Sequence, residues 1–190
     1  MYLFFDTETT GLPDNWRASY RLVDNWPRMV QLGYAVIDEN RKVINTRNII
    51  IKPDGFTIPV EASDIHRVTT ERAMKEGIDV KDALQEFIED VKKADVLVGH
   101  NIDFDMNIVG AELVRAGIAE YPLFNKRRLC LMKSSTDFCQ IPGSYGYKWP
   151  TLSELHIKLF GRDFEESHDA FEDVKATANC FFRLKTKGLI

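Results

Sequence analysis

Three short stretches of this 190-residue chain place acidic side chains directly beside apolar sequence. In the first stretch, Asp6 and Glu8 follow the apolar run Tyr2–Phe5. Residues two apart on a strand point to the same side, so both carboxylates face one spot if the strand continues through Glu8. Two carboxylates held together at the edge of a core repel each other, and they require a proton, a cation or a metal ion between them.

The second stretch is GHNIDFDMNIV, at residues 99–109. It lies where a short apolar segment meets a predicted helix, which is a common position for ligand sites in α/β proteins. The stretch contains Asp103 and Asp105. A carboxylate in the first turn of a helix is also favourable for purely structural reasons, so this stretch alone leaves a structural role open.

The third stretch is SHDAFEDVKAT, at residues 167–177. Ser167 is a suitable cap for a helix whose apolar stripe lies close to Asp173. An acid near a core face is costly unless it is paired or bound to a metal ion. His168 is expected at the start of the same helix, where by itself it is equally consistent with a surface or capping residue.

Together the three stretches offer four carboxylates and one histidine: Asp6, Glu8, Asp105, Asp173 and His168. Four carboxylates suit two hard divalent cations, which prefer oxygen ligands. A pair of such ions about 3.5–4 Å apart activates a water and stabilises the leaving oxygen in phosphodiester hydrolysis. A histidine, whose unperturbed pKa is about 6.5, accepts the proton of that water near neutral pH. The predicted chemistry is metal-dependent hydrolysis.

The elements that position these residues follow from hydrophobic periodicity and capping patterns. Strands are expected at 2–5, with a possible continuation through Glu8, and at 29–38, 43–51, 95–99 and 128–132. Helices are expected at 70–75, 79–93, 103–116, 151–160 and 168–185. A four-residue polar turn joins the second and third strands and favours an antiparallel pair, whereas helices and strands alternate later. We therefore expect a single α/β domain with a mixed five-stranded sheet flanked by helices.

Composition excludes several classes of protein. The chain is 44% hydrophobic and 28% charged, as is ordinary for a soluble globular domain. No stretch approaches a membrane span in length, and the N-terminus has no signal-peptide pattern. Three cysteines without a C-x-x-C pair favour reduced thiols and a cytoplasmic location. A net charge of −4 argues against coating nucleic acid by bulk charge.

The motifs D-T-E-T-T-G-L-P, H-N-x-x-F-D and H-x-A-x-x-D occur in this order and resemble those of the DEDDh exonuclease superfamily. That superfamily includes ribonuclease T and the proofreading epsilon subunit of bacterial DNA polymerase III. The resemblance extends from Met1 to about Leu184. It implies a ribonuclease-H-like fold, with residues 1–190 forming one exonuclease domain. It also implies 3′→5′ hydrolysis of nucleic acid ends that releases nucleoside 5′-monophosphates.

The resemblance further assigns roles to individual residues. It implies that Asp6, Glu8, Asp105 and Asp173 hold two Mg²⁺ or Mn²⁺ ions, and that His168 is the general base. Residues implied to contact the 3′-terminal nucleotide are Thr9, Thr10, Gly11, Leu12, Ile65 and His66. Asn101 is expected to be either structural or substrate-facing.

Several alternatives stay open at this point. The partner is expected to be a DNA or RNA 3′ end, single-stranded, while a homodimer or an association with a polymerase is neither favoured nor excluded. A non-catalytic module that binds nucleic acid ends or a protein, and a hydrolase of short oligonucleotides, are the competing functions. Residues 14–28 form a long aromatic and basic connection, which either grips a single strand or packs on the domain surface.

Overall fold

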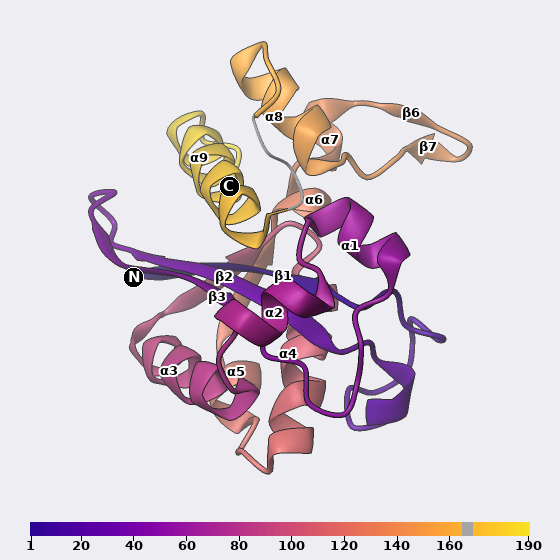
Figure 1. Ribbon diagram of the computed structural model, residues 1–190. Helices are drawn as coiled ribbons and strands as arrows, with labels where there is room; N and C mark the ends of the chain where they lie inside the picture. The colour runs from indigo at the N-terminus through magenta and orange to yellow at the C-terminus, as the bar shows by residue number, and fades with distance from the viewer. Residues whose placement is uncertain (165–168) are drawn as a thin grey trace.

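A five-stranded mixed sheet lies at the centre of the computed structural model, which describes residues 1–164 and 169–190 (Figure 1). Its strands are β1 (Tyr2–Thr9), β2 (Met29–Ile37), β3 (Val43–Ile50), β4 (Val96–Gly99) and β5 (Arg127–Cys130). They lie in the order β3-β2-β1-β4-β5. Strand β1 pairs antiparallel with β2 and parallel with β4, so the predicted α/β class and mixed sheet are confirmed.

Helices cover both faces of this sheet (Figure 1). They are α1 (Val60–His66), α2 (Thr70–Glu76), α3 (Val80–Lys93), α4 (Ile102–Ala116), α5 (Tyr121–Phe124), α6 (Leu131–Ser134), α7 (Thr136–Cys139), α8 (Leu152–Phe160) and α9 (Ala170–Thr186). Helices α3 and α4 pack on one face, and α8 and α9 pack on the other. None of these described helices combines the length and the apolar character that crossing a membrane requires.

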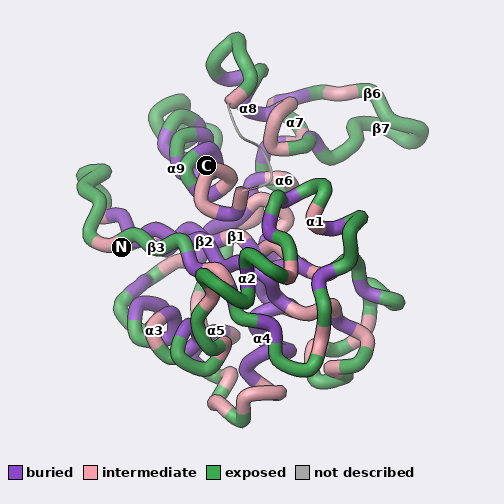
Figure 2. The backbone as a smooth tube through the Cα atoms, in the orientation of Figure 1, coloured by how far each residue is buried: buried purple, intermediate pink, exposed green. Residues whose placement is uncertain are grey.

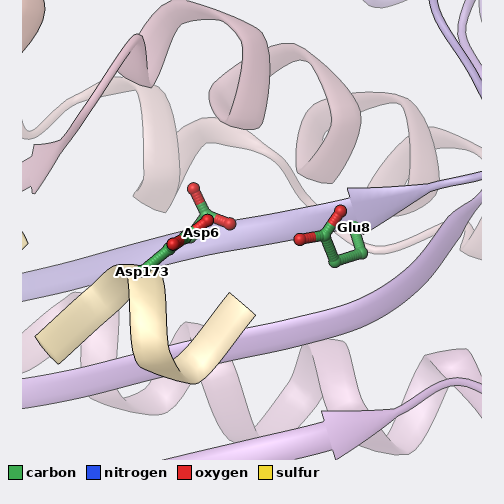
Figure 3. Close-up of side chains that lie close together, drawn as sticks. All are labelled: Asp6, Glu8 and Asp173. Carbon is green, nitrogen blue, oxygen red and sulfur yellow. The ribbon is translucent and has the colours of Figure 1, made fainter. Parts of the chain in front are cut away.

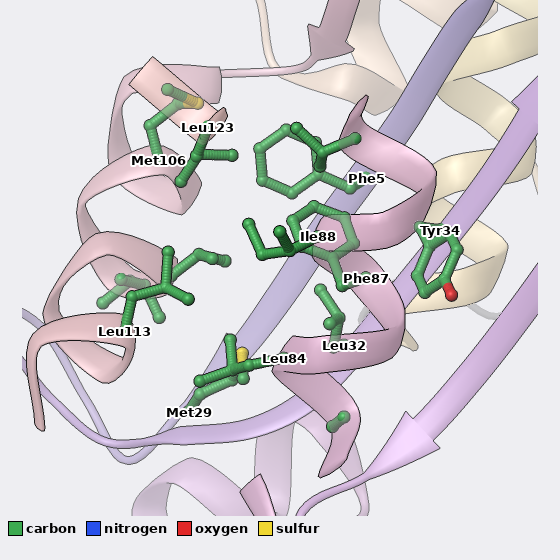
Figure 4. Packing of buried hydrophobic residues seen from close by; sticks show 14 of the residues in the cluster. Phe5, Met29, Leu32, Tyr34, Leu84, Phe87, Ile88, Met106, Leu113 and Leu123 are labelled. Atoms are coloured by element: carbon green, nitrogen blue, oxygen red, sulfur yellow. The ribbon is translucent and has the colours of Figure 1, made fainter. Parts of the chain in front are cut away.

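Strand β1 is buried on both faces because it lies in the middle of the sheet (Figure 2). Leu3 and Phe5 point into the cluster formed with α3 and α4, where Phe5 packs on Phe87 (Figure 4). Phe4 points the other way, into the cluster formed with α8 and α9. Side chains alternate along a strand, so the even-numbered acids that follow continue on the α9 face.

The predicted capping patterns fix the start of two helices. Asp79 accepts a hydrogen bond from the Lys81 amide at 2.7 Å and caps α3. Thr151 and Glu154 form the expected capping box of α8, each accepting from the other's backbone amide. The described part of α9 begins at Ala170 with Asp169 as its cap, while the predicted cap Ser167 lies outside the described residues.

Several of the described regions differ from the sequence-based expectation. Helix α1 was not predicted, and it covers the C-terminal end of β1. The segment expected to form one strand at 128–132 splits into β5, which ends at Cys130, and α6. A small hairpin of β6 (Pro142–Gly143) and β7 (Gly146–Tyr147) lies in a stretch for which no strand was expected.

Candidate active site

Three acidic side chains come together beside the central strand β1, on the face of the sheet that α9 covers (Figure 3). Asp6 and Glu8 come from one side of β1, and Asp173 comes from the first turn of α9. Each offers one carboxylate oxygen, and these oxygens all lie within 4.8 Å of one another. All three residues are partly buried. The structure therefore places Asp6 and Glu8 on one side of β1, as alternation along a strand predicts, and brings Asp173 of the third stretch beside them.

Gly33 is the reason that α9 reaches the acids. It faces Asp6 across the β1–β2 pair. An ideal Cβ at this position would lie 2.5 Å from the carbonyl carbon of Ala170 and 2.6 Å from the amide nitrogen of Phe171. The backbone at the start of α9 thus rests directly on β2, and Asp173 in the same turn comes level with the acids of β1.

A hydrogen-bonded group of side chains anchors the residue that caps α9. Gln31 donates from Nε2 to Asp169 at 2.9 Å and to Asn48 at 2.7 Å. Asn48 in turn donates to Asp169 at 3.3 Å. Burial of the Asp169 carboxyl favours a higher pKa, but these bonds and two from backbone amides outweigh it, so its pKa is lowered. Asp169 is therefore an ionised cap, fixed to β2 and β3.

Asp105 reaches the site from the opposite face of the sheet. Its Oδ1 accepts two hydrogen bonds from Thr7, at 2.8 Å from the hydroxyl and 3.0 Å from the amide. Thr7 lies between the two acids of β1, so its side chain points toward α4. Sequence analysis missed Thr7, although its central place in D-T-E gives this orientation. Asp105 is fully buried beside the trio.

Burial and mutual repulsion raise the pKa of three of these carboxyls. The pKa of Asp6 is well above its usual value, because the group is desolvated and faces Asp105 and Asp173. Desolvation and the same two neighbours raise the pKa of Glu8 to about 8. Desolvation raises the pKa of Asp105 to about 7, although the bonds from Thr7 lower it in part. Without a cation, the site therefore retains protons near neutral pH.

This donor set fits divalent metal ions. The groups that converge are all carboxylates, which are the ligands that hard divalent cations prefer. Burial, together with repulsion between the carboxyls, raises their pKa values, so ionisation of the site is unfavourable without a cation. A cation would remove the need for protons. His168, the predicted general base, lies outside the described residues.

A pocket of about 370 Å³ opens beside Glu8. The turn after β1 forms one wall, and α1 forms another. Six of the residues predicted to contact substrate line it, namely Thr9, Thr10, Gly11, Leu12, Ile65 and His66. Phe104 lines it as well and was not predicted, although it is the aromatic residue of the H-N-x-x-F-D motif. Of the site acids, Glu8 lines this pocket together with these residues.

Hydrogen bonds hold the walls of this pocket in place. Thr9 donates from its hydroxyl to the Gly11 carbonyl at 2.7 Å, and Thr10 accepts from the Arg28 amide at 3.0 Å. The ring of His66 is buried, and its Nδ1 accepts from the Val68 amide at 3.2 Å. Burial lowers the pKa of His66, so the ring is a neutral part of the wall.

Asn101 does not line this pocket. It adopts a left-handed backbone conformation, with φ of 65°, at the junction of β4 and α4. Few residues other than glycine take this conformation readily, and asparagine is one of them. Of the two roles that the sequence left open for Asn101, its backbone geometry therefore favours the structural one.

Comparison with known proteins places this chain in a known family. A family model described as "Exonuclease" matches residues 3–181. A PolC-type DNA polymerase III of Caldanaerobacter subterraneus is 29% identical over 98% of this chain, and one of Pediococcus pentosaceus is 30% identical over 97%. The chain spans only 12% and 11% of these two relatives.

A ribonuclease T of Shewanella frigidimarina is closer in length. It is 26% identical over 93% of this chain, which corresponds to 78% of that protein. Among solved structures, Escherichia coli exonuclease I in complex with a dA16 oligonucleotide shares the fold with a TM-score of 0.75. That match covers 99% of this chain and 41% of the other, at 20% identity.

Proposed function

Because the chain belongs to the exonuclease family, whose model matches residues 3–181, we propose that it is a metal-dependent 3′→5′ exonuclease. It hydrolyses phosphodiester bonds at the 3′ ends of nucleic acid strands and releases nucleoside 5′-monophosphates. The observation that carries this proposal is the carboxylate trio, whose oxygens lie within 4.8 Å of one another, beside a pocket of about 370 Å³. The ribonuclease T relative and the oligonucleotide complex of exonuclease I support it.

Two Mg²⁺ or Mn²⁺ ions are the proposed cofactors. Asp6, Glu8 and Asp173 would hold them together with Asp105, whose orientation Thr7 sets. When bound, the ions supply an activated water and stabilise the leaving oxygen. A zinc-bound form of the E. coli exonuclease I complex with single-stranded DNA supports a metal site in this fold.

The pocket walls bind and orient the last nucleotide of the strand. Leu12 and Phe104 offer apolar surface for the base, and backbone groups of the turn at 9–12 face its sugar. Because Glu8 borders the pocket, a nucleotide bound there places its 5′ phosphodiester at the carboxylates. The apolar walls also exclude bulk water from this bond.

His168 is the proposed general base, which accepts the proton of the attacking water at a ring nitrogen. Its neighbour Asp169 is fixed by Gln31 and Asn48, and this anchoring supports a defined position for the start of α9. We expect His168→Ala to lower turnover by roughly 10²–10⁴, the usual scale for general acid–base catalysis. A loss of metal affinity in this variant would assign His168 another role.

The proposed function is tested with end-labelled single-stranded DNA and RNA oligonucleotides of several lengths in Mg²⁺. Wild-type protein should give a ladder shortened from the 3′ end, and Asp105→Asn should abolish it. Asp103→Asn is the matched control, because Asp103 lies on the same turn of α4 but pairs with Lys133. Equal laddering by wild type and Asp105→Asn would contradict the proposal. Cleavage restricted to the shortest strands would select a short-oligonucleotide hydrolase instead.

A further inference from the structure

The segment 14–28 is an ordered part of the domain, and most of its aromatic side chains pack inward. Trp26 is buried, and its Nε1 donates to the Ser19 carbonyl at 3.1 Å. Tyr20 stacks on Phe124 with ring centroids 4.2 Å apart. For these residues, surface packing is the correct interpretation of the aromatic composition.

Trp16 behaves differently from the rest of the segment. It is 55% exposed. Its ring lies against Phe104, with centroids 5.7 Å apart and planes inclined by 40°. Phe104 lines the pocket beside Glu8, so Trp16 extends the aromatic wall of that pocket outward by one ring.

Hydrogen bonds fix the backbone that carries Trp16. The Asn15 amide donates to the side chain of Asn25 at 2.8 Å, and Asn25 returns a bond to the Asn15 carbonyl at 3.0 Å. The Arg17 amide donates to the Asn15 side chain at 2.9 Å. The residues on both sides of Trp16 are thus held before any ligand binds, which reduces the entropic cost of using the ring in binding.

We propose that Trp16 stacks on the base next to the 3′-terminal nucleotide, and that this contact selects strands whose last two bases are unpaired. The inference rests on the proposed function, in which the terminal nucleotide occupies the pocket. The penultimate nucleotide follows the phosphodiester held at the carboxylates. Phe104 directly precedes Asp105 in the chain and contacts Trp16, so the ring of Trp16 is the exposed aromatic surface offered to its base. Aromatic rings bind bases by stacking with little regard to sequence, whereas a base inside a duplex is already stacked and paired.

The test measures the affinity of a fluorescein-labelled single-stranded oligonucleotide by anisotropy. Dissociation constants are determined in the Asp105→Asn background, so that bound strands are not degraded. We expect Trp16→Ala to raise the dissociation constant by roughly 5- to 50-fold, because stacking contributes at this scale. Trp16→Phe should retain most of the affinity. Leu22→Ala is the matched control, since Leu22 is 62% exposed on the same segment and is not part of the pocket.

A second set of oligonucleotides lacks one base at a chosen position. Removing the penultimate base should weaken binding of the oligonucleotide to protein that has Trp16. The same removal should change the dissociation constant of the Trp16→Ala variant little. The inference would be overturned if removal of the penultimate base weakened binding equally in both proteins. It would also be overturned if removal of the terminal base were the change whose effect depends on Trp16. Turnover by protein without the Asp105→Asn change is measured separately. If the active protein degrades strands but Trp16→Ala does not change the affinity for the oligonucleotide, the stacking role is refuted and the exonuclease assignment stays intact.

Discussion

At the scale of single residues, Thr7 controls how a buried acid joins the site. Asp105 arrives from the α4 face of the sheet, whereas Asp6 lies on the α9 face. Both groups of Thr7 that can donate do so to the same oxygen of Asp105. The other oxygen is thereby turned away from Thr7. We regard Thr7 as a positioning residue for the proposed metal site.

Thr7→Val tests this role, because valine keeps the shape of threonine and removes only the hydroxyl. The Mg²⁺ concentration for half-maximal activity should rise roughly tenfold, within the range seen when partners of metal ligands are lost. Turnover at saturating Mg²⁺ should change less. Thr7→Ser should restore the metal dependence of the wild type. An unchanged metal dependence in Thr7→Val would show that the backbone amide alone suffices.

The sequence predicts the site at this scale to different extents. Asp6 and Glu8 are identifiable because alternation along a strand places them on one side. Asp173 is identifiable because an acid beside an apolar helical stripe needs a partner. Thr7 and Phe104 were missed, since their roles depend on contacts between segments far apart in the chain, and such contacts leave no local periodicity.

At the scale of elements, the docking of α9 on β2 is the step that completes the trio. The contact is between backbones, because Gly33 has no side chain. Asp169 and its partners Gln31 and Asn48 fix the same helix end from the side. A small change at this junction therefore moves Asp173 away from the β1 acids.

Gly33→Ala is expected to keep the fold and to lower the activity. The new methyl group would meet backbone atoms at 2.5–2.6 Å, and backbone cannot be relieved by a side-chain rotation. We expect the free energy of unfolding to fall by about 1–3 kcal/mol, the usual cost of overpacking. Exonuclease activity should fall by at least tenfold while far-UV circular dichroism stays native. Wild-type activity in this variant would mean that α9 shifts without displacing Asp173.

Elements with a long pattern were predictable, whereas the short elements were predicted only in part. The helix at 79–93 was predicted because its apolar stripe repeats over four turns and Asp79 caps it. Helix α1 has only seven residues, with Ala62 and His66 buried and Val60 and Ile65 exposed. That pattern has no apolar stripe that would predict a helix. The stability of α1 therefore comes from packing on the end of the sheet rather than from its own sequence.

At the scale of the whole molecule, the acids of the site link stability to pH. The pKa values of Glu8 and Asp105 are raised to about 8 and about 7 in the folded protein without metal. In the unfolded chain these groups return to about 4. The folded state then binds more protons than the unfolded state between about pH 4 and 8. The free energy of unfolding therefore decreases as pH rises through this window.

The measurement is the thermal midpoint in EDTA between pH 5.5 and 8.5. It should fall as pH rises, and Glu8→Gln should flatten the slope because the amide does not ionise. Adding Mg²⁺ or Mn²⁺ should restore the midpoint most at the alkaline end, since a cation stabilises the ionised carboxylates. A midpoint in EDTA that stays constant across this range would contradict the raised pKa values.

The position of α9 in the chain has a consequence for biosynthesis. A polypeptide leaves the ribosome from its N-terminus, so Asp6 and Glu8 emerge long before Asp173. Until α9 emerges and settles on Gly33, the nascent chain lacks one third of the carboxylate trio. The proposed metal site is therefore complete only after α9 (Ala170–Thr186) has left the ribosome and folded onto the sheet.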